Sequence, residues 1–159
     1  MSVLLWLSNT PLAVWARESD SVWGYPTVLF LHTLGLGILV GLTTAVDFRV
    51  LGFGDRLPLA PMEKFFRFIW LGFWINAASG IGLLIITPTK LVNPAFFVKM
   101  TLIAAGVVDM WFLKRRAFGD AQQTESVSAS AKVLAASSLL IWAGAITAGR
   151  LMAYVGTGH

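Results

Sequence analysis

Cysteine is absent from this chain of 159 residues, and histidine occurs only twice, as His32 and as the last residue, His159. Without cysteine there can be no disulfide, thiolate metal site, iron–sulfur ligation or cysteine nucleophile. Charged residues make up only 13% of the chain, about half of their usual share in soluble domains. The chemistry left to this chain rests on one internal imidazole and on its carboxylate, cationic and thioether side chains.

Apolar residues are abundant instead, at 57% of the chain, with a mean hydropathy of +0.74. A soluble core cannot use that much apolar surface, because soluble domains contain roughly 45–50% apolar residues. The net charge of +4 comes from basic residues that flank the apolar runs and form no patch, so we expect no nucleic-acid partner. The composition predicts a single integral membrane domain over residues 1–159, in contact with the lipid bilayer.

Four apolar runs are long enough to cross a membrane as helices. The predicted spans cover about residues 22–49, 62–87, 94–115 and 130–155. Residues 1–19 are predicted to be two short pieces, broken at residues 8–11, that lie as an amphipathic helix in the membrane interface, with Thr10 and Pro11 as a start signal. Short connections place neighbouring helices antiparallel. The predicted fold is therefore all-α, a four-transmembrane-helix up-down bundle with an N-terminal interfacial helix.

Basic residues orient this bundle, because short cytoplasmic loops carry an excess of lysine and arginine. Eight of the twelve basic residues flank the first and the last connection between the spans. They are Arg49, Arg56, Lys64, Arg67, Lys114, Arg115, Arg116 and Lys132. We therefore expect these two connections inside the cell and both termini on the outer side.

His32 lies about six residues into the first span, roughly 9 Å below its outer end. An ionisable residue inside a span is by default a candidate for a functional site. The topology brings Lys99, Met100, Arg150 and Met152 to a comparable outer depth. No Ser/His/Asp set can be assembled there, because the spans have no carboxylate at the depth of His32.

Two ligands fit this outer layer, and a third interpretation needs none. For b-type haem, His32 would be one axial ligand and Met100 or Met152 the other. Lys99 and Arg150 would face the propionates. For copper, His32 with Met100 and Met152 suits Cu(I), although the two cations would repel it. Alternatively, the chain is an accessory or structural subunit without a ligand, and its methionines fill gaps in the packing.

Other polar and small residues in the spans have simpler predicted roles. Asn76 is expected to make an interhelical hydrogen bond worth about 1 kcal/mol. Gly35, Gly37 and Gly80 would make room for a macrocycle if haem is bound. On the inner side, four charged residues are expected to form structural ion pairs that anchor the helix ends. These residues are Asp47, Arg49, Arg67 and Asp109.

Several segments carry a resemblance that covers nearly the whole chain. They are RESDSVWGYPTVLFLHTLGLGILVG, VDFRVLG, FWINAASG, NPAFFVKM and AITAGRLMAYVG. With them, the chain resembles an uncharacterised family of small bacterial four-helix integral membrane proteins. It is more loosely similar to the membrane domains of copper-resistance D-type proteins and of b-type cytochromes, which place a histidine in an outer helix turn, as His32 is placed here.

The resemblance implies a multi-pass protein of the bacterial inner membrane, with both termini on the periplasmic side. It brings no established activity. The chain departs from the haem-binding pattern because a second histidine within the spans is absent. A dimer would supply one His32 from each copy. We therefore expect a homo-oligomer or a subunit of a larger membrane complex.

Overall fold

The computed structural model describes residues 2–54, 56–119 and 127–154, and these contain helices and no strand. The helices are α1 (Ser2–Ser8), α2 (Pro11–Glu18), α3 (Tyr25–Leu51), η1 (Ala60–Lys64), α4 (Phe65–Ile86), η2 (Pro88–Val92), α5 (Pro94–Phe118) and α6 (Ala129–Tyr154). The predicted all-α fold is confirmed. The four long helices α3, α4, α5 and α6, with α4 extended by η1, are each long and apolar enough to cross a membrane. The chain is a multi-pass membrane protein.

Glycine and proline set the ends of the long helices. Gly52 ends α3 with a φ of 105°, a left-handed conformation that favours glycine. Asn93 precedes α5, and its side chain accepts a hydrogen bond from the Ala95 amide at 2.9 Å. Pro94 then occupies the first turn of α5, where its missing N–H group costs nothing.

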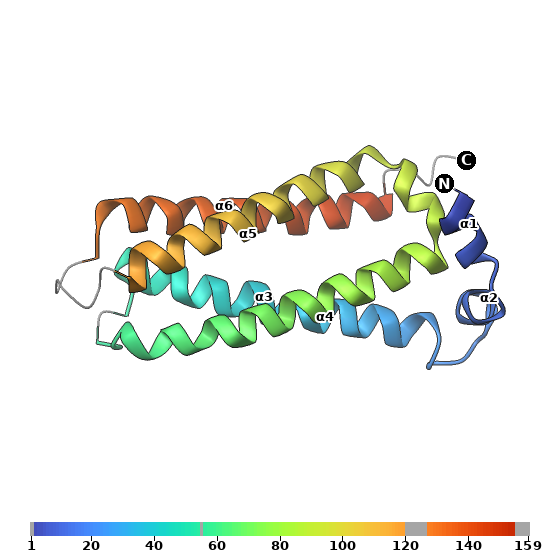
Figure 1. The fold of residues 1–159 in the computed structure, drawn as a ribbon, viewed down its shortest axis with the longest axis horizontal. Coiled ribbons are helices and arrows are strands. Elements are labelled where there is room, and N and C mark those ends of the chain that lie inside the picture. The colour runs from blue at the N-terminus through green and yellow to red at the C-terminus, as the bar shows by residue number, and fades with distance from the viewer. Residues whose placement is uncertain (1, 55, 120–126, 155–159) are drawn as a thin grey trace.

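The four long helices form two antiparallel hairpins (Figure 1). α3 pairs with α4, and α5 pairs with α6, while α3 and α6 pack together and join the hairpins. Among the described residues, α4 and α5 make few or no close contacts. The two hairpins are therefore joined mainly through α3 and α6.

The two ends of the bundle differ in charge. We call the end where α3 and α5 begin the terminal end, since α1 and α2 also lie there (Figure 1). The opposite end, with the α3–α4 and α5–α6 connections, is the basic end. α1 and α2 are two separate short helices, and Arg17 on α2 donates to the Ile86 carbonyl at the end of α4 at 3.3 Å.

α3 and α4 approach each other closely through two glycines. A Cβ atom at Gly35 would lie 2.6 Å from the Asn76 amide nitrogen, and one at Gly72 would lie 2.8 Å from the Leu39 amide nitrogen. Gly37 instead has nothing within 4 Å of a Cβ position. The close approach therefore depends on Gly35 and Gly72 and fixes the register of the two helices.

The buried hydrophobic core lies mainly in the half of the bundle nearer the basic end. Val50, Ile69 and Leu113 are completely buried there, and the cluster extends toward the middle as far as Leu39 and Ala145. The half nearer the terminal end contributes little to this cluster of described residues.

Candidate functional site

His32 on α3 is held against α4 by two hydrogen bonds from one ring nitrogen. Its Nδ1 atom lies 3.0 Å from the Asn76 carbonyl oxygen and 3.2 Å from Ser79 Oγ. Because a carbonyl only accepts, Nδ1 carries the proton and donates it, and Nε2 keeps its lone pair. Nε2 makes no hydrogen bond to the residues that the structure describes. The ring is therefore oriented, with one nitrogen left to bind a ligand.

The contact between α3 and α4 at this level is reciprocal. The Asn76 side chain donates from Nδ2 to the His32 backbone carbonyl at 2.8 Å, which confirms the predicted interhelical bond of Asn76. A Cβ atom at Gly80 would lie 3.2 Å from His32 Cε1, so the glycine makes room for the imidazole. His32, Asn76, Ser79 and Gly80 together form what we call the terminal polar layer.

Lys99 on α5 is the cation nearest to this layer. Its side chain is half-buried and its Nζ atom lies 3.7 Å from a Cβ position at Gly149 on α6. It is within electrostatic range of the His32 ring and of Lys90. Within residues 2–54, 56–119 and 127–154, Lys99 makes no ion pair and no hydrogen bond. Its positive charge is therefore not compensated by this part of the chain.

Two of the other three predicted ligand residues lie farther out. Met100 is 39% exposed and Arg150 is also exposed, so both side chains lie on the outer surface of the isolated chain. Met152 is half-buried, and its carbonyl accepts a hydrogen bond from Asn93 Nδ2 at 3.4 Å. The structure thus brings Lys99 into range of His32 and leaves Met100 and Arg150 outside.

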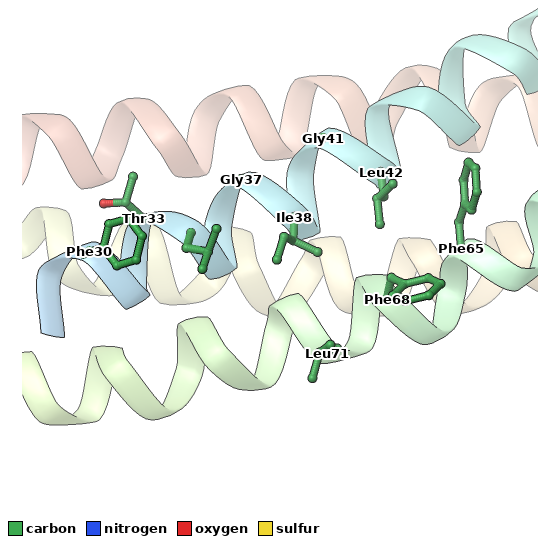
Figure 2. Close-up of a pocket in the computed structure, with 10 residues that line it drawn as sticks. Phe30, Thr33, Gly37, Ile38, Gly41, Leu42, Phe65, Phe68 and Leu71 are labelled. Atoms are coloured by element: carbon green, nitrogen blue, oxygen red, sulfur yellow. The ribbon is translucent and has the colours of Figure 1, made fainter. Parts of the chain in front are cut away.

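The glycines that were predicted to make room for a macrocycle have other roles. Gly35 accommodates the backbone of α4, and Gly80 accommodates the His32 ring. Gly37 lies on the outside of the bundle, where it lines an apolar groove of about 730 Å³ with Thr33 and Gly41 (Figure 2). No titratable side chain lines this groove. Its chemistry is that of a lipid-facing surface.

A second polar cluster lies toward the basic end, and we call it the carboxylate layer: Asp47 on α3, Asp109 on α5, and Ser137 and Ser138 on α6. Asp47 is 0% exposed and Asp109 is 8% exposed. Ser137 Oγ donates to Asp109 Oδ1 at 2.7 Å. Ser138 lies beside Asp47, and Asp109 is within electrostatic range of it. Three helices therefore gather two carboxyl groups and two hydroxyl groups in the interior.

Several atoms of the carboxylate layer have no hydrogen-bond partner among the described residues. They are both carboxyl oxygens of Asp47, Asp109 Oδ2 and Ser138 Oγ, together with the neighbouring indole nitrogen of Trp142 on α6. Buried polar atoms are rarely left unpaired, because each costs about 1–3 kcal/mol. This layer is therefore incomplete as a purely structural network.

The ion pairing predicted for this level is not formed among the described residues. Arg67 is exposed, and Arg49 Nε donates to the Leu57 carbonyl in the α3–α4 connection. The ion pairs of the described chain lie elsewhere, between Arg17 and Glu18 at 3.7 Å and between Lys114 and Glu63 at 3.8 Å. The adjacent serines of α6 were the available sequence signal for this cluster, since polar pairs are rare in so apolar a helix.

Comparison with known proteins gives no match: no family model, curated protein or solved structure is significantly similar to the chain. The described residues also contain no group of three or more His, Cys, Asp or Glu side chains placed to hold a metal ion. Family membership stays a prediction. The features of the described chain that bear on function are therefore the terminal polar layer and the carboxylate layer.

Proposed function

We propose that this membrane protein is a redox subunit that binds b-type haem in the half of the bundle nearer the terminal end. The observation that carries the proposal is the orientation of His32. Histidines that bind a metal almost always donate their other ring N–H to a carbonyl, carboxylate or water. The Nδ1 bond of His32 to the Asn76 carbonyl has this form, and it leaves Nε2 to serve as an axial ligand.

The charge of Lys99 supports an anionic ligand. A half-buried ammonium group without a carboxylate partner favours a ligand that brings its own negative charge. Haem brings two propionates and also an iron atom for the imidazole, so it uses both Lys99 and His32. The same charge disfavours a bare copper ion at this site. Haem would supply one-electron chemistry, while the protein would orient it and set its charge environment.

Space for the macrocycle would come from the side of the bundle between α4 and α5. These helices make few or no close contacts among the described residues, and the hydrophobic core is concentrated toward the other end. Gly35 and Gly80 do not provide this space, because both are occupied by packing within the α3–α4 hairpin.

A single chain offers no second histidine within the spans, so the second axial ligand of the haem iron has to be another residue. Met152 is half-buried, whereas Met100 lies on the outer surface, where a second copy has access to it. We therefore propose a homo-oligomer, in which the second ligand is Met152 or a residue of the neighbouring copy. We further propose the bacterial inner membrane as the location, with the basic end inside and the termini in the periplasm.

The test is the absorption spectrum of the protein purified in detergent from cells supplied with haem precursor. The proposal predicts a Soret band whose intensity corresponds to about one haem per chain or per dimer. It also predicts a reduction of about tenfold or more in haem content in His32→Ala and a smaller loss in Lys99→Met. Arg150→Gln serves as the matched control for Lys99→Met, because it removes an exposed cation at the same end.

Two results would contradict the proposal. A wild-type protein without a Soret band would exclude haem, whatever the behaviour of the variants. If that colourless protein holds copper that is lost in His32→Ala, the copper alternative is supported. If it holds neither, the chain is an accessory membrane subunit. Haem that is retained in a folded His32→Ala protein would show that His32 is not the ligand.

A further inference from the structure

The carboxylate layer is not used by the proposed haem site, and it lies in the opposite half of the bundle. We infer that Asp47 and Asp109, with Ser137 and Ser138, form a proton-binding site inside the membrane-spanning bundle. This inference is independent of the haem proposal. It rests on burial, on missing partners and on the charges that surround the layer.

The first argument is the absence of a compensating positive charge. Asp47 is fully buried and Asp109 nearly so, and neither makes an ion pair with a described residue. Two ionised carboxylates in this position would carry two negative charges in a medium of low polarity. Such a state is too costly to persist unless positive charge is bound. The pair must therefore hold a cation, and a proton is the simplest one.

The charged groups on the surrounding elements do not provide this compensation. On α3, Arg49 is directed to the Leu57 carbonyl. The cations of the other elements packed around the layer have exposed side chains. They are Lys64 on η1, Arg67 on α4, Lys114, Arg115 and Arg116 on α5, and Lys132 on α6. The carboxylate Glu63 on η1 is exposed and pairs with Lys114.

The hydroxyl groups supply the second argument. Ser137 already donates to Asp109, which satisfies one of the four carboxyl oxygens. Ser138 is 0% exposed, lies beside Asp47 and has no hydrogen-bond partner among the described residues. A proton on Asp47 turns one of its oxygens into a donor, and Ser138 Oγ can accept from it. A protonated Asp47 therefore has an acceptor beside it, so the neutral carboxyl group can be satisfied inside the bundle.

The helical backbone favours a proton over a metal cation. Sodium sites inside membrane bundles typically use backbone carbonyls of unwound helix segments. α3, α5 and α6 continue as helices through Asp47, Asp109 and Ser138, so their carbonyls are engaged within the helices. Ser137 Oγ and Asp109 Oδ1 are already bonded to each other, so four oxygens of the layer remain uncommitted, fewer than the about six that a hard cation prefers.

The position of the layer determines which side exchanges the proton. Asp47 lies four residues before the end of α3, which corresponds to about 6 Å along the helix. Asp109 lies nine residues before the end of α5, about 14 Å from it. His32 is 15 residues before Asp47, roughly 22 Å away along α3. The site therefore exchanges its proton with the solution at the basic end.

The test is infrared spectroscopy of the full chain in lipid nanodiscs, which detects the C=O stretch of protonated carboxyl groups. At neutral pH we expect a protonated-carboxyl band in the wild type that disappears at alkaline pH. Asp47→Asn and Asp109→Asn should each reduce this band by about half or more, because the two groups share the proton, and the double variant should abolish it. Ser138→Ala should shift the frequency of the band without removing it.

Glu63→Gln is the matched control, since it removes an exposed carboxylate at the same end and should leave the band unchanged. A wild-type spectrum without a protonated carboxyl group at neutral pH would overturn the inference, and this readout does not depend on any variant folding. The spectrum is repeated with sodium in place of potassium at constant ionic strength. A band that persists supports proton binding, whereas a band that is lost in sodium would show that a metal cation binds instead.

Discussion

The terminal polar layer and the carboxylate layer both lie within apolar helices, yet their polar atoms are satisfied to different degrees. His32 and Asn76 exchange hydrogen bonds across one hairpin, and Ser79 accepts from the same ring. Asp47 lies between hairpins and has no hydrogen-bond partner among the described residues. In the terminal polar layer, the α3–α4 hairpin thus matches its polar groups within itself. In the carboxylate layer, Asp109 Oδ2 and Ser138 Oγ of the α5–α6 hairpin also lack a partner among the described residues.

This difference has an energetic consequence. A matched interhelical hydrogen bond adds about 0.6 kcal/mol to the stability of a membrane protein. An unmatched buried polar group costs about 1–3 kcal/mol. Substitutions in the terminal polar layer should therefore remove stability, while neutralising Asp47 should not.

The largest effect is expected where the two helices of the first hairpin touch. Gly35→Ala places a Cβ atom 2.6 Å from the Asn76 amide nitrogen and 2.8 Å from the Gly72 carbonyl oxygen. The backbones must separate, so we expect a loss of about 1–3 kcal/mol in the free energy of unfolding. Gly37→Ala is the control, since nothing lies within 4 Å of its Cβ position. Equal unfolding curves for the two variants would disprove the close approach at Gly35.

The next largest loss of stability is expected when Asp109 Oδ1, the hydrogen-bonded carboxyl oxygen of the carboxylate layer, loses its donor. Ser137→Ala leaves Asp109 Oδ1 without its donor, which should lower the free energy of unfolding by about 1–2 kcal/mol. Thr147→Ala on the same helix is the control, because this exposed hydroxyl bonds only its own helix, at the Ala143 carbonyl. Denaturant titration in mixed micelles measures both. A Ser137→Ala protein as stable as its control would mean that the bond to Asp109 contributes nothing.

A smaller loss is expected from Asn76→Ala. This change removes the 2.8 Å bond to the His32 carbonyl but keeps the backbone carbonyl that accepts from His32 Nδ1. We expect a decrease of about 0.6 kcal/mol in stability. Thr101→Ala on α5 is the control, since that exposed hydroxyl only bonds the Phe97 carbonyl. A loss no larger than that of the control would show that the two helices do not need this bond.

The fold was predictable because the length and composition of the apolar runs determine it. The depth of each residue along its helix also followed from the sequence, and Lys99 does lie within electrostatic range of His32. The direction in which each side chain points around its helix axis could not be predicted from the sequence. Met100 is next to Lys99 in the chain and therefore points about 100° away from it. The sequence gives depth well and facing direction poorly when a helix is apolar on all sides.

The same reason explains the error about the inner ion pairs. Arg49 is two residues from Asp47 on α3, and residues at this spacing do not face each other on a helix. Arg67 on α4 is exposed and directed away from the interior. Which residues meet inside is decided by the packing of α3 against α6. That contact joins segments far apart in the sequence, so it cannot be predicted from the pattern of residues within either helix.

The most direct test of the contrast is the thermal stability of Asp47→Asn measured beside that of Asn76→Ala, in one detergent and at neutral pH. Asparagine keeps the shape of Asp47 and cannot ionise, so the unfolding temperature should stay the same or rise, while that of Asn76→Ala should fall. If Asp47→Asn instead lowers the unfolding temperature as much as Asn76→Ala or more, Asp47 is a matched, ionised part of the structure, and the contrast between the two layers is wrong.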